Sequence, residues 1–76
     1  MLLQLARQEK MPYQKNSDLP NSVRHVLPAK AQGYYRKAFN SAWKQYNGDE
    51  EVAHKVAWSA VKKDFVKGSS GRWREK

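Results

Sequence analysis

The stretch YYRKAFNSAWKQY, residues 34–46, holds five of the nine aromatic side chains of the protein. Such rings could form either a platform on which nucleic-acid bases stack or the core of a small helical protein. They recur at steps of three and four residues with alanines between them, which places them along one side of an α-helix. Lys37 and Lys44 fall on the opposite side. A stacking platform would need rings and cations on the same surface, so the pattern favours a core.

The length and composition of the chain make such a core necessary. With 76 residues and no cysteine, the chain can use neither disulfides nor thiolate metal sites for stability. Its aromatic side chains are the main available source of buried area, at about 150–250 Å² each. The 15 Lys and Arg residues against 7 Asp and Glu give a net charge of +8. This charge favours anionic partners, which are nucleic acid, acidic lipid headgroups or an acidic protein.

The aromatic stretch lies within a predicted helix from residue 28 to about residue 47. A proline is tolerated at its first position, and Gly48 supplies the stop. We expect Phe39 and Trp43 in the core, whereas the hydroxyl of Tyr34, at the edge of the stripe, reaches water. The apolar stripe as a whole comprises Ala31, Tyr34, Tyr35, Ala38, Phe39, Ala42, Trp43 and Tyr46. The cations of this helix, away from the stripe, are Lys30, Arg36, Lys37 and Lys44.

A shorter and a longer helix are predicted on either side of this one. Residues 16–28, NSDLPNSVRHVLP, form a short helix that Asp18 would cap and Pro28 would end. A further long helix begins at Asp49 and continues to Gly68, with two glutamates that complement its dipole. Its apolar side comprises Val52, Ala53, Val56, Ala57, Ala60, Val61 and Phe65, with Trp58 at the edge. The predicted fold class is therefore all-α, a compact array of one short and two long helices with a basic C-terminal tail.

The two ends of the chain differ from these helices. The tail, residues 67–76, is polar as far as Gly71 and then places Trp73 between Arg72 and Arg74. We expect Trp73 to fold back onto the core; otherwise it is an exposed contact residue. At the other end, we divide the chain into an N-terminal extension, residues 1–10, and a helical domain, residues 11–76. The extension is expected to be disordered or weakly helical.

The chain carries little that could support catalysis. It has no cysteine nucleophile, no Gly-x-Ser-x-Gly elbow, no phosphate-binding Gly-rich loop and no His-x-x-x-His pair. The consecutive acids at residues 49–51 suit a helix N-terminus and lack the ligand spacing of a calcium loop. We therefore predict no enzyme activity, no catalytic residues, no metal site and no cofactor.

The two histidines are the remaining candidates for chemistry. His54 falls in the middle of the apolar arc of its predicted helix, and His25 lies near the end of the short helix. A buried histidine must satisfy its ring nitrogens, which a backbone carbonyl or an aspartate could do. Both are accordingly predicted to be structural, with pH sensing as the alternative. In that alternative, a buried neutral His54 would make the fold less stable as the pH falls below about 6.5.

The location and assembly of the protein follow from what its apolar segments can do. No stretch approaches the ~20 apolar residues of a membrane span. Leu2, Leu3 and Leu5 form too short a run for a signal peptide. We expect a cytoplasmic protein. A monomer is expected, although an exposed Trp73 or Tyr34 could support dimers.

Several short motifs of the chain together resemble those of the ChaB family of small proteins. The motifs are His25-Val26-Leu27-Pro28, Ala38-Phe39-Asn40 with Ala42-Trp43, Ala53-His54-Lys55-Val56-Ala57-Trp58, and Gly71-x-Trp73. The resemblance covers about Met11 to Lys76 and implies a compact helical domain. It also implies a part in cation transport, because the family is named as cation transport regulators by association with a sodium-calcium/proton antiporter. Relatives in insect viruses have been treated as DNA-binding, and the family has no established catalytic residues to carry over.

Two binding functions are compatible with these features. The first is regulation of a membrane cation antiporter through protein contacts at its cytoplasmic face, as the resemblance implies. The second is non-specific binding to the DNA phosphate backbone. For either function the predicted contact residues are Lys30, Arg36, Lys37, Lys44, Arg72, Trp73 and Arg74. The plain alternative for the lysines is a solvated helix surface.

Overall fold

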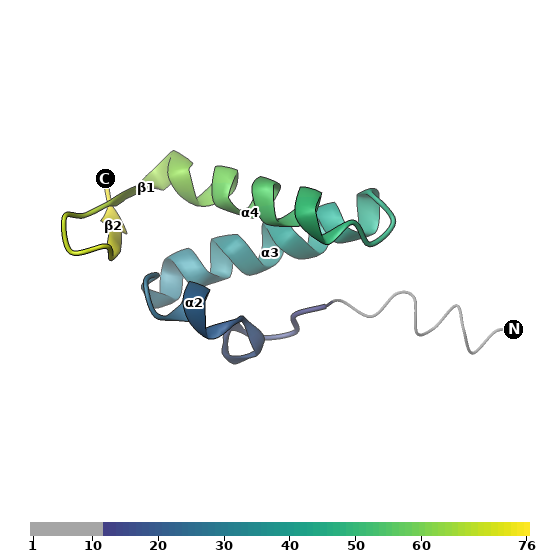
Figure 1. Ribbon diagram of the computed structural model, residues 1–76, viewed down its shortest axis with the longest axis horizontal. Coiled ribbons are helices and arrows are strands. Elements are labelled where there is room, and N and C mark those ends of the chain that lie inside the picture. Colours follow the sequence, from purple (N-terminus) through teal and green to yellow (C-terminus); the bar gives the residue numbers. More distant parts are fainter. Residues whose placement is uncertain (1–11) are drawn as a thin grey trace, which may run out of the picture.

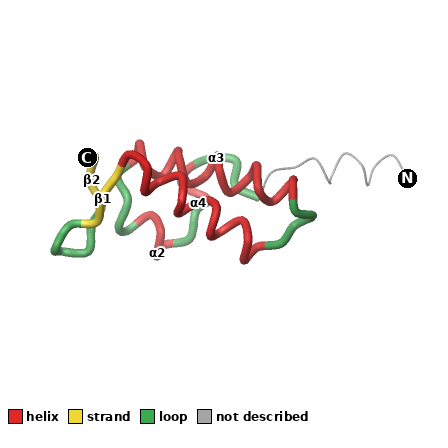
Figure 2. The backbone as a smooth tube through the Cα atoms, turned by 90° about the horizontal axis from the view of Figure 1, so that it is seen from above, coloured by secondary structure: helices red, strands yellow, loops and turns green. Residues whose placement is uncertain are grey.

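A computed structural model describes residues 12–76, so the predicted extension, residues 1–10, lies outside the described residues. The elements are the 3₁₀ turn η1 (Asn16–Asp18), the helices α2 (Asn21–Arg24), α3 (Ala29–Gln45) and α4 (Glu50–Asp64), and the strands β1 (Phe65–Lys67) and β2 (Trp73–Glu75). The two long helices lie side by side and antiparallel, and α2 packs beside the first half of α3 (Figure 1). The hairpin of β1 and β2 lies at the end of the array opposite the turn between α3 and α4 (Figure 2).

Two aromatic rings of α3 lie in the core, and the other two, those of Tyr34 and Trp43, are partly buried and pack against it. Tyr35 and Phe39 are almost fully buried and stack on each other, with ring centroids 5.9 Å apart. Trp43 is half-buried and packs against the same cluster, whereas Tyr46, predicted in the stripe, is 46% exposed. Buried alanines on both long helices allow the two backbones to approach closely. The buried apolar residues are Leu19, Val23, Leu27, Ala31, Tyr35, Phe39, Ala42, Ala53, Ala57, Val61 and Phe65.

The predicted short helix is interrupted in the structure. It consists of η1 and α2, separated by Leu19 and Pro20, and the Leu19 backbone is extended (ψ 152°) because it precedes a proline. Asp18 therefore does not cap α2. Its carboxylate instead accepts hydrogen bonds from the backbone N–H groups of Gln14 and Lys15, at 3.2 and 3.3 Å.

The turn between the long helices agrees with the prediction. Asn47 and Gly48 both have positive φ, 56° and 80°, and the Gly48 N–H donates to the Trp43 carbonyl at 2.7 Å. This geometry ends α3 and favours glycine. Asp49 then caps α4, since its carboxylate accepts a hydrogen bond from the Val52 N–H at 3.2 Å.

The C-terminal tail departs from the predicted all-α class. Helix α4 ends at Asp64 rather than Gly68, and Phe65–Lys67 pairs antiparallel with Trp73–Glu75. Phe and Val suit a strand, and the Gly-Ser-Ser-Gly segment that follows Lys67 suits a turn. The turn is closed by a 2.7 Å hydrogen bond from the Gly68 N–H to the Arg72 carbonyl. The fold is therefore mostly helical, with a small two-stranded sheet.

A buried asparagine fixes the start of the described chain. Asn40 is only 7% exposed, and its side-chain amide bonds both backbone groups of Tyr13. Its oxygen accepts from the Tyr13 N–H at 3.2 Å, and its nitrogen donates to the Tyr13 carbonyl at 2.7 Å. The Tyr13 ring in turn lies against Phe39, with centroids 4.9 Å apart. The apolar periodicity did not predict this contact, because Asn40 is polar and lies beside the stripe.

Candidate binding surface

Two of the four predicted contact cations of α3 are tied to other elements of the fold. The Lys30 ammonium forms an ion pair with the Glu75 carboxylate of β2 at 2.7 Å. The hydrogen bond and the charge of Glu75 raise the pKa of Lys30. The Arg36 Nε donates to the Asn16 side chain of η1 at 2.9 Å. Lys30 and Arg36 thus help to hold the hairpin and η1 against α3, which reduces their availability to a partner.

The other two cations of α3, Lys37 and Lys44, are exposed. Within residues 12–76 they make no side-chain hydrogen bond or ion pair. They are seven residues apart, which corresponds to about 10 Å along a helix. This pair remains available to an anionic partner.

The basic tail is split between solvent and core. Arg72 and Arg74 are exposed, whereas Trp73 is half-buried and packs against the core. Its backbone N–H donates to the Val26 carbonyl at 2.8 Å. Its ring lies against Trp58, with centroids 5.3 Å apart and planes inclined at 36°. Trp73 therefore folds back onto the core, as expected.

A groove of about 320 Å³ borders the two tryptophans. Val26, Trp58, Gly71 and Trp73 supply apolar or backbone surface, and Lys62 and Lys67 complete the lining. Neither Lys62 nor Lys67 was predicted from the sequence as a site residue. Lys62 lies one helical turn after Trp58, a signal that could have been used. Lys67 lies opposite Trp73 only because the hairpin forms, and the hairpin was not predicted.

His54 differs from its predicted environment, because it is exposed rather than buried in the apolar arc. Both of its ring nitrogens nevertheless have side-chain partners. Nδ1 lies 2.5 Å from the Tyr35 hydroxyl, and Nε2 lies 3.1 Å from the Trp58 indole nitrogen. An indole N–H can only donate, so Nε2 accepts and the neutral ring carries its hydrogen on Nδ1, which donates to Tyr35. The Tyr35 and Trp58 rings cover part of the imidazole, with centroids 5.8 and 6.2 Å from it, and the rest of the side chain is open to solvent.

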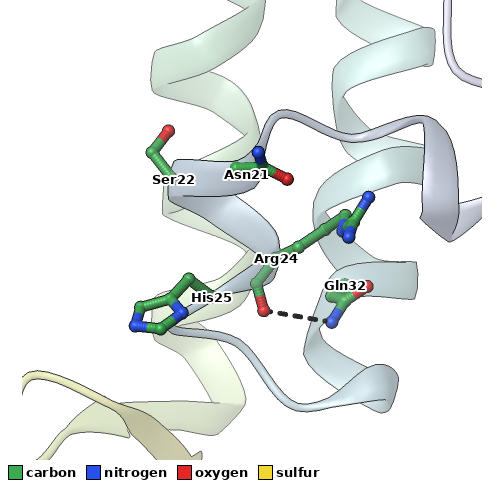
Figure 3. Close-up of a pocket in the computed structure, with 5 residues that line it drawn as sticks. All are labelled: Asn21, Ser22, Arg24, His25 and Gln32. Carbon is green, nitrogen blue, oxygen red and sulfur yellow. Dashed lines mark hydrogen bonds between the residues drawn. The ribbon is translucent and has the colours of Figure 1, made fainter.

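His25 has a different setting, at the C-terminal end of α2. It is exposed, and its backbone N–H donates to the Asn21 carbonyl at 2.8 Å. It lines an open hollow of about 680 Å³ together with Asn21, Ser22, Arg24 and Gln32. Figure 3 shows its ring projecting away from Gln32. The predicted structural hydrogen bond of the His25 ring is not found within residues 12–76.

Gln32, which the sequence analysis did not single out, closes the end of α2. Its amide nitrogen donates to the Leu27 carbonyl at 2.8 Å and to the Arg24 carbonyl at 3.4 Å (Figure 3 shows the second bond). These bonds satisfy carbonyls that a helix end leaves without partners. The hollow at α2 is thus bordered by side-chain hydrogen bonds that close the end of this helix.

Groups that could coordinate a metal ion do not gather in the part of the chain that the structure describes. Among residues 12–76 there is no cluster of three His, Asp or Glu side chains placed to share a metal ion. The helices of the same segment are all too short or too polar to cross a bilayer.

These features define a small helical domain closed by a β-hairpin, whose polar side chains mostly tie elements together while several cations face outward. The chain belongs to the ChaB family, because the ChaB family model matches residues 19–76. This confirms the resemblance found in the sequence.

Relatives from several enterobacteria are about half identical to this chain. A protein of Escherichia coli (strain K12) named "Putative cation transport regulator ChaB" is 52% identical over 75 residues, covering 87% of this chain and 99% of the relative. A protein of the same name from Shigella flexneri gives the same values. An NMR solution structure of "the putative cation transport regulator ChaB" has a TM-score of 0.78 and 51% identity, covering 86% of this chain and 99% of that one.

Proposed function

We propose that this protein is a non-catalytic regulatory module that acts on a membrane cation antiporter by binding acidic segments at its cytoplasmic face. The relatives named as cation transport regulators, at 52% identity, support a part in cation transport. The chemistry of the surface supports the mode of action. A protein with a net charge of +8 is attracted to acidic loops and to anionic headgroups at the cytoplasmic side of a membrane.

The single observation that carries this proposal is that several carboxylates are bonded within the fold, whereas exposed cations are left to contact a partner. Three of the carboxylates serve the fold: Asp18 bonds the backbone before η1, Asp49 caps α4, and Glu75 pairs with Lys30. The exposed cations Lys37 and Lys44 make no such bond within residues 12–76. The protein therefore presents positive charge on the outer side of α3, which suits the recognition of an anionic partner.

The proposal is tested with a sodium-calcium/proton antiporter from the same organism in proteoliposomes, oriented with its cytoplasmic face outward. Added protein should change the rate of cation–proton exchange in a saturable manner, and doubling the salt should weaken the effect. Lys30→Gln serves as a control, because it removes a cation that is already paired with Glu75. This variant should change the exchange rate nearly as much as the wild-type protein does. An exchange rate that does not respond to the protein at any concentration would refute the proposal.

A second candidate function is non-specific binding to DNA. The observation that favours it is the line of free cations on α3, Lys37 and Lys44, together with the exposed Arg72 and Arg74 of the hairpin. Each phosphate contact should contribute about 0.9 to the slope of log affinity against log salt. The double variant Lys37→Glu/Lys44→Glu should therefore reduce that slope by about 2. The absence of a mobility shift with duplex DNA at about 0.15 M salt and roughly 100 μM protein would exclude this function.

A further inference from the structure

We infer that the groove beside Trp58 and Trp73 is a docking site for a partner segment that carries one large apolar side chain between carboxylates. The inference rests on the proposed function and specifies where the acidic partner binds and by what chemistry. The groove was defined above by its six lining residues, and two of these, Lys62 and Lys67, are cationic.

The apolar part of the groove is held in place by contacts within the fold. The Trp73 N–H donates to the Val26 carbonyl at 2.8 Å, which fastens β2 to the segment after α2. The Trp58 indole N–H donates to His54 at 3.1 Å, and the Trp58 ring meets Tyr35 at 75° with centroids 5.4 Å apart. Both rings are therefore positioned before a partner arrives, which lowers the entropic cost of binding.

The charge around the groove selects an anionic partner. Lys62 and Lys67 are exposed, and no carboxylate is among the lining residues. The nearest acids in the sequence face α3: Glu75 pairs with Lys30, and Asp64 lies close enough to the Tyr34 hydroxyl to raise the pKa of Tyr34. A partner carboxylate on either side of an inserted apolar group would meet a lysine and no competing acid.

The size of the groove limits the apolar group. A volume of about 320 Å³ lies at the lower end for ligand sites. It accommodates one phenylalanine or leucine side chain of a peptide. Tryptophans in a preformed concave site are also the residue type that most often dominates binding energy at protein interfaces.

Other occupants fit these observations less well. A single nucleic-acid strand would need successive exposed rings beside the groove, but Tyr35, which packs against Trp58, is buried, and the exposed Tyr46 lies at the far end of α3. A second copy of the chain would bring another net charge of +8 against the two lysines.

The test is a titration of the full-length protein with a synthetic ten-residue peptide that has one phenylalanine flanked by aspartates. The indole N–H signals of Trp58 and Trp73 should shift in NMR spectra, whereas the signal of Trp43, which packs near Gly48 at the other end of α3, should not. A peptide with serine in place of the phenylalanine should bind about tenfold more weakly, as should one with serines in place of the aspartates.

Two matched variants decide where the peptide binds. Lys62→Glu/Lys67→Glu should weaken binding about tenfold or more, while Lys55→Glu/Lys63→Glu, which makes the same change of net charge at two exposed lysines outside the groove lining, should alter it about twofold at most. Unfolding curves of both variants verify that they fold. Equal losses of affinity in the two variants, a shift of the Trp43 signal, or no binding of the peptide would show that the groove is not the docking site.

The remaining outcomes separate this inference from the proposed function. Tighter binding of single-stranded oligothymidylate to the same two tryptophans would assign the groove to nucleic acid and overturn the inference. A dimeric sedimentation mass that the Lys62→Glu/Lys67→Glu change abolishes would assign it to a second copy, with the same consequence. If the peptide binds through Lys37 and Lys44 instead, the groove is wrong while the proposed function stands. The antiport assay fails or succeeds independently of all three results.

Discussion

The hydroxyl of Tyr35 is the point at which the core meets the surface of α4. The residue is 1% exposed, so its polar atom needs a partner within the protein. His54 supplies that partner and is itself bonded by Trp58, which forms a short chain of three side chains from the core to the groove. His54 therefore bonds two side chains of the fold although it is exposed, with partners other than the backbone carbonyl or aspartate expected, and its structural role stays a prediction.

Alkaline pH should weaken the fold through Tyr35. Burial, with a smaller contribution from Tyr13, raises the pKa of Tyr35 to about 12, while an unfolded tyrosine titrates near 10. The stabilisation is complete below about pH 10 and is lost as the pH rises toward 12, because only the unfolded state releases its proton in that range. Urea midpoints measured across this range should fall more steeply for the wild type than for Tyr35→Phe. Parallel curves for the two proteins would contradict the assignment.

The tautomer of His54 can be observed directly. Because Trp58 can only donate, Nε2 should be unprotonated and Nδ1 protonated in the neutral ring. Nitrogen chemical shifts of the His54 imidazole at neutral pH report which nitrogen carries the hydrogen. Trp58→Phe removes the constraint and should let the other tautomer appear. A neutral His54 with its hydrogen on Nε2 in the wild type would show that the bond to Trp58 does not form.

At the scale of elements, the ends of helices and strands depend on a few backbone positions. Gly48 and Gly71 have positive φ, 80° and 93°, at the turn between the long helices and in the hairpin. Gly33 is different, because it lies within α3 and a methyl group added there would meet nothing within 4 Å. Glycine is thus needed at the two turns and only weakens the helix at Gly33.

Alanine substitutions should separate these glycines by the sign of their effect. Gly33→Ala should raise the free energy of unfolding by up to roughly 1 kcal/mol, because alanine loses less backbone entropy in a helix. Gly71→Ala should lower it by about 1–3 kcal/mol, since a φ of 93° is strained for a residue with a Cβ. Denaturant titrations of both variants beside the wild type measure the two changes. Destabilisation by Gly33→Ala would mean that α3 is not a regular helix there.

The elements differ in how far the sequence could predict them. The long helices were predictable because their apolar positions repeat over several turns, and because Gly48 and Asp49 mark where α3 ends and where α4 begins. The hairpin was not predictable, because Phe65 continues the helical spacing of α4. In the structure Phe65 is buried and belongs to a strand that pairs with Trp73–Glu75. The groove depends on that hairpin, so Lys67 could not be placed beside Trp73. The hydrogen bond from Asn40 to Tyr13 joins residues 27 apart in sequence, and the one from Gln32 reaches back to Leu27, before the start of α3, so helical periodicity indicates neither.

At the scale of the whole molecule, the buried rings and the exposed ammonium groups occupy different regions, and the half-buried Trp58 and Trp73 meet Lys62 and Lys67 at the groove. The buried cluster joins α2, both long helices and β1, while exposed lysines lie on the outer sides of α3 and α4. A core this small depends on each large side chain that it contains. The side chains that a partner could contact therefore lie at the margin of this core, and they include the half-buried Trp58 and Trp73.

The most direct test of this partition is the free energy of unfolding of Phe39→Ala. Phe39 is 4% exposed and contacts three other rings, those of Tyr13, Tyr35 and Trp43. Its truncation should lower the free energy of unfolding by about 3–5 kcal/mol, a large part of the stability of so small a domain. A variant as stable as the wild type would show that these rings are not the core, and that the surface described here is not the one a partner meets.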